Sequence, residues 1–215
     1  MTAAESIHSI PASDDKPIRV YQWKGSAPVR GIVQIAHGMG EHALRYRPIA
    51  QALVNAGYFV YANDHRGHGE LAAQANTIGD FGPGGFPVLV DDMTRVTRMA
   101  RDGEKGKPLV LLGHSMGSFA AQLYLLDHSE LLDGVALSGT TALDLLGAAA
   151  MSGRWKLEDL NASFEPARTP FDWLSRDKAV VDAYIADPLC GFNVNAGIVW
   201  IAVRRRAAAL DRPGD

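Results

Sequence analysis

The chain has 215 residues, of which 47% are hydrophobic and 21% are charged, and its formal net charge is -3. These values predict one folded domain, or one with a modest insertion, and exclude a disordered or fibrous chain. The slightly acidic balance offers no basic face, so no nucleic-acid partner is expected. Cys190 is the only cysteine, which excludes an intrachain disulfide and a zinc cluster built from several cysteines.

The first two thirds of the chain alternate short apolar runs with helical patterns. Strands are predicted at 7–10, 18–23, 31–36, 58–62, 108–112 and 135–138. A helix that ends at Gly57 is expected to bury Ile49, Ala52, Leu53 and Ala56, and two more helices are predicted around 89–100 and over 115–126. Asp91 and Asp92 are expected in the first turns of the helix around 89–100. Nearly all-apolar strands that alternate with helices predict an α/β fold with a mostly parallel sheet, covered on both faces.

After Gly139 this rhythm changes. A helix is predicted over 141–151, and three of the four tryptophans follow, at Trp155, Trp173 and Trp200. This composition favours a helical subdomain, either with its own core or with apolar surface that covers something. The expected division is a core over 1–139, a helical cap over 140–203 and an irregular tail over 204–215. The first fifteen residues lack the long apolar run of a signal peptide, and no run approaches the ~20 residues of a membrane-spanning helix, so a cytoplasmic protein is expected.

Gly113-His114-Ser115-Met116-Gly117 is the strongest chemical signal. This G-x-S-x-G follows a predicted strand and opens a predicted helix, which is the context of a strained turn that presents a nucleophilic serine. Side chains at the two glycine positions are expected to clash in such a turn. Ser115 is therefore the predicted nucleophile, and the amide of Met116 points to where negative charge would develop. His114 is expected to be structural.

A second glycine-rich loop, from His37 to His42, follows the strand predicted at 31–36. The amide of Met39 is predicted to supply a second oxyanion-hole donor beside that of Met116. The segment from Gly38 to Ala43 also fits the dinucleotide-binding pattern G-x-G-x-x-A, with Asp64 at the distance that pattern requires. That alternative leaves Gly113 to Gly117 unexplained, whereas a hydrolase accounts for both loops.

A third polar loop, Asp64-His65-Arg66-Gly67-His68-Gly69, follows the strand predicted at 58–62. Its histidines and aspartate are able to ligate a metal. The favoured interpretation is a polar loop whose side chains hydrogen-bond to neighbouring loops at the carboxyl ends of the strands. No metal and no other cofactor is therefore predicted.

Together the three loops resemble the α/β-hydrolase family, and within it the group of monoacylglycerol lipases, lysophospholipases and serine aminopeptidase-like hydrolases. The segments Ser175-Arg176-Asp177 and Asp187 to Phe192 are similar to the end of that group's cap. Ser118 stands where the group usually has another glycine. The resemblance implies ester hydrolysis through an acyl-enzyme on Ser115, with Met39 and Met116 as oxyanion-hole amides and a lipid-like acyl chain under the cap.

The triad of this fold has the chain order serine, acid, histidine. None of the seven histidines lies more than two residues beyond the helix predicted over 115–126; they are His8, His37, His42, His65, His68, His114 and His128. Asp187 matches the cap motif, and Asp211 and Asp215 follow no predicted strand, so neither acid nor base is assigned. A C-terminally truncated hydrolase is expected, of doubtful activity. The alternative is a remnant that binds a lipid or acyl ligand without turnover.

The expected partners follow from the resemblance to lipid hydrolases that have a cap. A small lipid or ester molecule is the predicted substrate, and the cap is a candidate for transient contact with a membrane surface. A fold that ends before its last strands would expose an apolar sheet edge, which predicts self-association.

Overall fold

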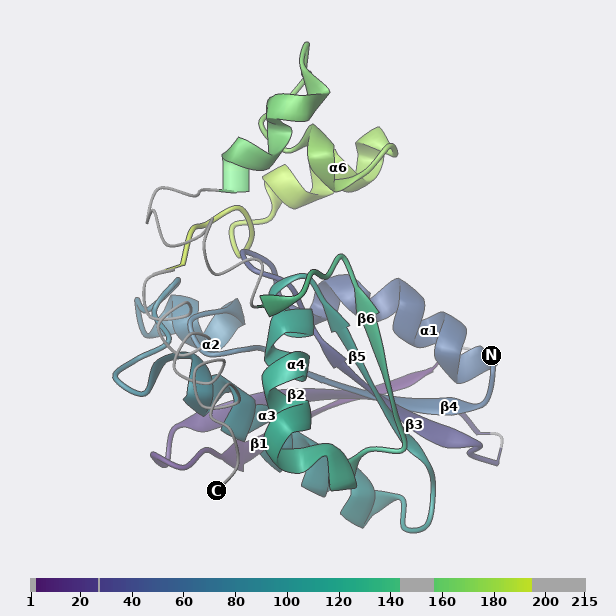
Figure 1. The fold of residues 1–215 in the computed structure, drawn as a ribbon. Coiled ribbons are helices and arrows are strands. Elements are labelled where there is room, and N and C mark those ends of the chain that lie inside the picture. The colour runs from purple at the N-terminus through teal and green to yellow at the C-terminus, as the bar shows by residue number, and fades with distance from the viewer. Residues whose placement is uncertain (1–2, 27, 144–156, 195–215) are drawn as a thin grey trace.

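The computed structural model describes residues 3–26, 28–143 and 157–194. Its centre is a six-stranded sheet with the order β1-β2-β4-β3-β5-β6 (Figure 1). The strands are β1 Ala4–Pro11, β2 Pro17–Lys24, β3 Gly31–Ala36, β4 Tyr58–Asn63, β5 Leu109–His114 and β6 Gly134–Ser138. All six predicted strands are present, within a few residues of their expected ends.

The sheet is parallel where strands alternate with helices and antiparallel at its N-terminal edge. β3 pairs in parallel with β4 and β5, and β5 with β6. β1 and β2 form an antiparallel hairpin whose second strand also pairs antiparallel with β4. Because β3 to β6 run in one direction, their carboxyl ends meet at one edge, and the three chemical loops follow β3, β4 and β5 at that edge.

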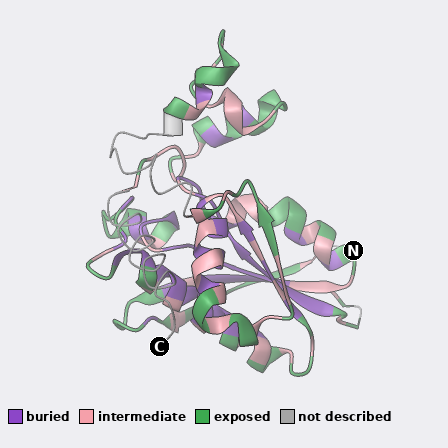
Figure 2. Cartoon of the chain, in the orientation of Figure 1, coloured by how far each residue is buried: buried purple, intermediate pink, exposed green. Residues whose placement is uncertain are grey.

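Helices cover both faces of the sheet, as predicted. α1 (Arg47–Asn55) lies on one face, and α3 (Gly85–Gly103) and α4 (Met116–His128) lie on the other. Residues of β3 pack into a hydrophobic core on each face of the sheet. Val33 and Ile35 pack with the α1 layer, and Ile32 and Ala36 pack with the α3 and α4 layer. Figure 2 shows the central strands buried and the outer faces of the helices exposed.

Two details of these helices differ from the sequence prediction. In α1 the buried residues are Ala50 and Val54, whereas Ile49, Ala52 and Ala56 are exposed. Arg47, Gln51 and Asn55 form a polar stripe, but apolar residues on both sides of it leave the exact centre of the buried face open, and the prediction placed that centre wrongly. The start of α3 at Gly85 also leaves no acidic residue in its first turn, which corrects the expectation for Asp91 and Asp92.

A buried polar chain connects the sheet to both helices of one layer. The amide of Gln34, fully buried on β3, donates to the Met93 carbonyl at 2.9 Å, and its oxygen accepts from Thr97 Oγ1 at 2.6 Å. Thr97 in turn accepts from the Tyr124 hydroxyl at 2.9 Å. Since these bonds satisfy the buried amide, they fix the rotation of α3 and α4 over β3.

The described segment 157–194 stands above the carboxyl ends of the strands (Figure 1). It contains the 3-10 helices η3 (Leu157–Phe164) and η4 (Asp172–Leu174) and the helix α6 (Lys178–Ala186). The predicted helix at 141–151, Trp155, Trp200 and the tail at 204–215 lie outside the described residues, apart from the start of that helix. Within the described part of the chain, no helix is long and apolar enough to cross a membrane.

Candidate active site

Ser115 occupies the sharp turn between β5 and α4. Its backbone has φ 50° and ψ -118°, a positive-φ conformation that is costly for any residue with a Cβ. The Ser115 amide donates to the Ser138 carbonyl at 2.9 Å, and its carbonyl accepts from the Ser118 hydroxyl at 2.6 Å. These bonds from β6 and α4 hold the strained residue in place.

The two flanking glycines are required by close backbone packing. A Cβ at Gly113 would lie 2.6 Å from the Gly117 carbonyl oxygen, and one at Gly117 would lie 2.1 Å from the Ala36 carbonyl oxygen. Both distances are shorter than any real contact, and both partners are backbone atoms that cannot rotate away. The clash that the sequence analysis expected at these positions is therefore present.

The loop after β3 lies beside Ser115. A Cβ built on Gly38 would be 3.4 Å from the Cβ of Ser115. Glu41 braces this loop from within: its carboxylate accepts from the Gly38 amide at 2.6 Å, the Tyr46 hydroxyl at 2.6 Å and Arg45 at 2.9 Å. In a dinucleotide site the Gly38 amide would face the pyrophosphate. Here the Glu41 carboxylate accepts from that amide and would repel the anion, which argues against the dinucleotide alternative.

His37 joins the loop after β3 to the loop after β4. Its Nε2 accepts from the His65 amide at 2.9 Å, so the ring proton lies on Nδ1, which donates to the Gly38 carbonyl at 2.8 Å. Burial, together with the neighbouring rings of His65 and His68, holds the pKa of His37 well below its usual value. The ring is therefore a neutral structural bridge at neutral pH.

The two histidines of the loop after β4 are buried in the same cluster. His68 accepts from the Gly40 amide at 3.4 Å and lies 2.9 Å from the Arg66 carbonyl. Burial lowers the pKa of His68 to about 4 and that of His65 to about 3. In the described part of the chain, neither ring nitrogen of His65 has a hydrogen-bond partner.

Asp64 completes the contacts of the loop after β4. Its carboxylate accepts from the Ala43 amide at 2.9 Å and from the Tyr21 hydroxyl at 3.1 Å. Burial raises the pKa of Asp64 above its usual value. The predicted polar loop that hydrogen-bonds to neighbouring loops is confirmed for Asp64, the His65 amide and the His68 ring. His114 lies 3.2 Å from the Ser138 hydroxyl through Nδ1, as a structural role predicts.

Helix α6 and the segment that follows it contact the loop after β3 from above. The Gly40 carbonyl accepts from the Tyr184 hydroxyl at 2.8 Å and from the Gly191 amide at 2.9 Å. The guanidinium of Arg45 lies over the Tyr184 ring, 4.6 Å from its centroid. Sequence reasoning gave no role to Tyr184, Arg45 or Glu41; the only signal was the spacing of Glu41 and Arg45, which suits an ion pair.

The fold brings the predicted nucleophile and the predicted oxyanion-hole loops together. Ser115, Met116 and the loop that carries Met39 meet at one edge of the sheet. In the described residues, no histidine ring or carboxylate is hydrogen-bonded to the Ser115 hydroxyl. A cavity of about 540 Å³ lies on the far side of the loop after β4, lined by Arg19, Arg66, Leu71 and Phe81 among others, and does not include Ser115.

Comparison with known proteins places this arrangement among hydrolases. A family profile described as serine aminopeptidase, S33 matches residues 27–215. A monoacylglycerol lipase of Mycolicibacterium smegmatis is 31% identical over 99% of this chain and 78% of its own length. Human monoglyceride lipase is 30% identical over 88% of this chain. The chain covers 63% of the human protein's length.

Solved structures give the same result for the fold. A thermostable carboxyl esterase from Bacillus coagulans, in complex with glycerol, superposes with a TM-score of 0.78 at 28% identity, over 94% of this chain and 72% of the esterase. An open form of a lipase superposes with a TM-score of 0.72 at 26% identity, over 93% of this chain and 72% of that chain. The predicted α/β-hydrolase architecture is confirmed.

Proposed function

The chain belongs to the serine aminopeptidase S33 family of α/β-hydrolases, and we propose that it hydrolyses carboxylic esters through an acyl-enzyme on Ser115. The proposed substrates are monoacylglycerols or lysophospholipids. The family supports hydrolysis of small lipid esters, since several relatives carry the name monoacylglycerol or monoglyceride lipase.

The observation that carries the proposal is the strained turn at Ser115. Its positive φ raises the side chain above the sheet edge, and the glycines at 113 and 117 allow the close backbone approach that this turn needs. The Ser115 oxygen attacks the ester carbonyl, the alcohol leaves with a proton, and water then releases the acid. Because Met116 is the first residue of α4, its amide has no partner within the helix and is free to bind the developing oxyanion.

The amide of Met39 is the proposed second donor. It lies in the loop that Glu41 braces and that comes within contact distance of Ser115 at Gly38. Bracing matters because an oxyanion hole lowers the barrier only when its donors are already fixed before the charge develops. In this fold the acid and the general base follow the nucleophile in the chain, and we assign neither to a described residue.

The segment 140–203 is the proposed cap. Its described part lies above the carboxyl ends of the strands and contacts the loop after β3 through Tyr184 and Gly191. An acyl chain under this segment would be shielded from water, while the ester carbonyl faces Ser115. Residues 1–139 then form the core that carries the nucleophile.

The experiment is covalent labelling of the full chain with a fluorophosphonate, read by intact mass, beside a Ser115→Ala variant. Turnover of p-nitrophenyl butyrate is measured in parallel. One added label and ester turnover, both absent in Ser115→Ala, are expected. A folded chain that is neither labelled nor active would overturn the proposal, and binding of a fatty acyl probe by that chain would support the alternative of ligand binding without turnover.

A further inference from the structure

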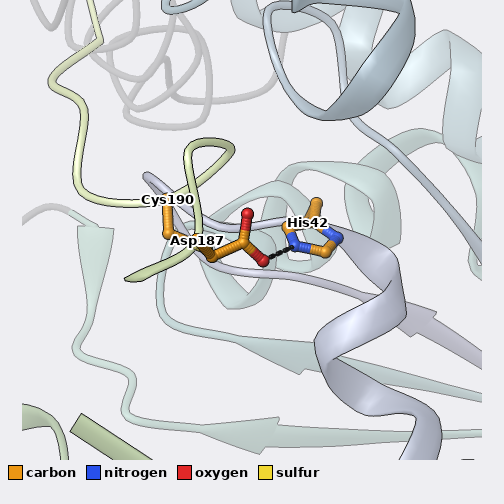
Figure 3. A group of neighbouring side chains, drawn as sticks. All are labelled: His42, Asp187 and Cys190. Carbon is orange, nitrogen blue, oxygen red and sulfur yellow. Dashed lines mark hydrogen bonds and ion pairs between the residues drawn. The ribbon is translucent and has the colours of Figure 1, made fainter. Parts of the chain in front are cut away.

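Three side chains with metal-binding atoms meet where the segment after α6 joins the core. His42 follows the loop after β3, whereas Asp187 and Cys190 lie just after α6 (Figure 3). One ligand atom from each lies within 4.8 Å of the others, and His42 Nε2 is 2.8 Å from Asp187 Oδ2. More than 140 residues separate the histidine from the other two in sequence, with an offset of 145 between His42 and Asp187.

Local hydrogen bonds hold the three residues in position. Asp187 ends α6, and its carbonyl accepts from the Cys190 amide at 3.0 Å in a tight turn. Asp187 Oδ1 accepts from the Leu189 amide at 2.9 Å, which leaves Oδ2 directed at His42. The bond from the Gly191 amide to the Gly40 carbonyl, at 2.9 Å, then fixes this turn against the loop that leads to His42. Backbone structure therefore places Asp187 and Cys190 beside His42.

The burial of the cluster suits a partly enclosed ion. The His42 side chain is 8% exposed and that of Asp187 is 30% exposed, so one side of the cluster is open to solvent. Cys190 is half-buried. The neighbouring cation Arg45 is paired with Glu41 and lies over the ring of Tyr184. An ion that enters from the open side would meet two acidic ligands and one imidazole.

We propose that His42, Asp187 and Cys190 form a zinc site that ties the cap segment to the loop after β3. Imidazole nitrogen, carboxylate oxygen and thiolate sulfur are the ligand types that Zn²⁺ accepts together, and three protein ligands leave a fourth position for water. Ligand atoms of a tetrahedral zinc site lie roughly 3.5 Å apart. To reach that spacing, the His42–Asp187 pair, now 2.8 Å apart, would open, and the wider separations, up to 4.8 Å, would close.

Binding has a defined proton balance. The Cys190 thiol must lose its proton to bind a metal, because the thiolate is the form that ligates. Zn²⁺ replaces that proton and forms a zinc–sulfur bond, and the proton goes to buffer. The resulting site, with one thiolate and one carboxylate around a divalent ion, is neutral, which suits its partial burial. Glu41, Arg45 and Tyr184 are the other charged or titratable groups that face it.

Cobalt(II) is the direct probe, because it occupies zinc sites and its spectrum reports a thiolate ligand. The full chain, stripped with a chelator, is titrated with Co²⁺ and then with Zn²⁺. One saturable equivalent with a thiolate-to-cobalt band in the near ultraviolet is expected, and Zn²⁺ should abolish the band. The Cys190→Ser variant keeps the His42–Asp187 pair, so it should fold, lose the band and bind Zn²⁺ about 100-fold more weakly or worse.

Matched controls decide whether these three residues bind the ion. His8→Gln, which removes a histidine on the edge strand β1, should leave the cobalt band and the zinc affinity unchanged, whereas Asp187→Asn should weaken both. Zn²⁺ should raise the midpoint of thermal unfolding of the wild-type chain and not that of Cys190→Ser. A cobalt band that survives in Cys190→Ser, or a folded wild-type chain that shows no saturable band, would overturn the proposal.

Discussion

Ser115 has a backbone conformation that its own side chain disfavours. At φ 50° and ψ -118°, only glycine is unstrained. Its hydroxyl does not offset the strain by capping α4, since the structure shows no side-chain cap bond there. The hydroxyl therefore contributes to the proposed chemistry and not to the start of the helix.

We expect Ser115→Gly to stabilise the fold relative to Ser115→Ala. Glycine relieves a backbone strain of order 1–3 kcal/mol in the folded state. It also increases the conformational entropy of the unfolded chain, which destabilises the fold by about 0.5–1 kcal/mol. The expected difference between the two variants in the free energy of unfolding is about 1 kcal/mol in favour of glycine, measured by urea denaturation. A glycine variant that is less stable than the alanine variant would mean that the turn is not strained.

Gly117→Ala should be among the most destabilising single substitutions in the core. Its Cβ would lie 2.1 Å from the Ala36 carbonyl oxygen and 2.6 Å from that of His37, so β3 and α4 would have to separate. The expected cost in the free energy of unfolding is about 3 kcal/mol or more.

Gly134→Ala is the matched control for that substitution. It lies in β6, where the nearest atom to an added Cβ is Val110 Cγ2 at an ordinary 3.5 Å. Its unfolding free energy should stay within about 1 kcal/mol of wild type, because alanine is no worse than glycine in a strand. Equal costs for the two variants in urea denaturation would contradict the packing argument.

At this scale the sequence predicted the strained serine and its two glycines, since a tight strand-to-helix turn depends on neighbouring residues. It did not predict that Glu41 braces the loop after β3 or that Tyr184 donates to Gly40. The bond from Tyr184 spans 144 positions. Such a contact depends on how the cap segment packs on the core, and no local pattern encodes it.

At the scale of elements, Arg66 joins three parts of the fold. Its guanidinium donates to Asp92 on α3 at 2.5 and 3.1 Å, and to Asp14 in the turn between β1 and β2 at 2.8 Å. Asp92 is only 3% exposed, and burial raises its pKa even though Arg66 counteracts this. The pair holds the loop after β4 between the hairpin and α3.

Arg66→Met should destabilise the protein by about 3–5 kcal/mol, because it leaves the buried Asp92 carboxylate without a partner. The double variant Arg66→Met with Asp92→Leu should recover most of that loss. The cost of the single variant should shrink as pH falls, since a carboxyl with a raised pKa takes up a proton early. The costs in the free energy of unfolding are measured by urea denaturation. If the cost of the double variant equals the sum of the costs of Arg66→Met and Asp92→Leu, the two groups do not act as a pair.

The elements that the sequence predicted best are those with the simplest environment. The strands β3 and β5 are nearly all apolar because helices cover both faces of the sheet, and their positions were predicted closely. α1 was placed correctly, but its buried face was not, because alanines fit both faces. The short α2 (Gly69–Gln74) was not predicted. Six residues give too little periodicity to identify a helix, and its position is set by the loop that begins at Asp64.

At the scale of the whole molecule, β6 forms one edge of the described sheet and β1 forms the other. Its residues from Ala136 to Ser138 are exposed, including Leu137 at 36%. An exposed strand edge with apolar side chains is a site for pairing with a second copy. The self-association expected from the sequence therefore stays a prediction, and size-exclusion chromatography with light scattering tests it; a monomer at high concentration would contradict it.

The buried histidines predict how the stability of the whole molecule depends on pH. His37, His65 and His68 stay neutral in the folded state, with a pKa of about 3 for His65 and about 4 for His68. In the unfolded chain each binds a proton near its ordinary pKa of about 6.5. Below that pH the unfolded state holds more protons than the folded state, so stability falls as the pH is lowered from about 6.5 toward 4.

Each such histidine contributes a slope of about 1.4 kcal/mol per pH unit, so three give about 4 kcal/mol per unit. From about pH 6.5 to 4 this slope removes about 10 kcal/mol, so a domain in the lower half of the typical range of about 5–15 kcal/mol should unfold in acid above pH 4. His65→Leu is the sharpest test, since neither ring nitrogen of His65 has a hydrogen-bond partner among the described residues. The variant should keep its stability at pH 7.5, lower the slope by about one third and move the acid transition to lower pH, as followed by circular dichroism. An unchanged slope in this variant would mean that His65 is not held neutral in the fold, and the pH dependence would then come from the other buried histidines and from carboxylates such as Asp14, whose pKa the Arg66 guanidinium lowers.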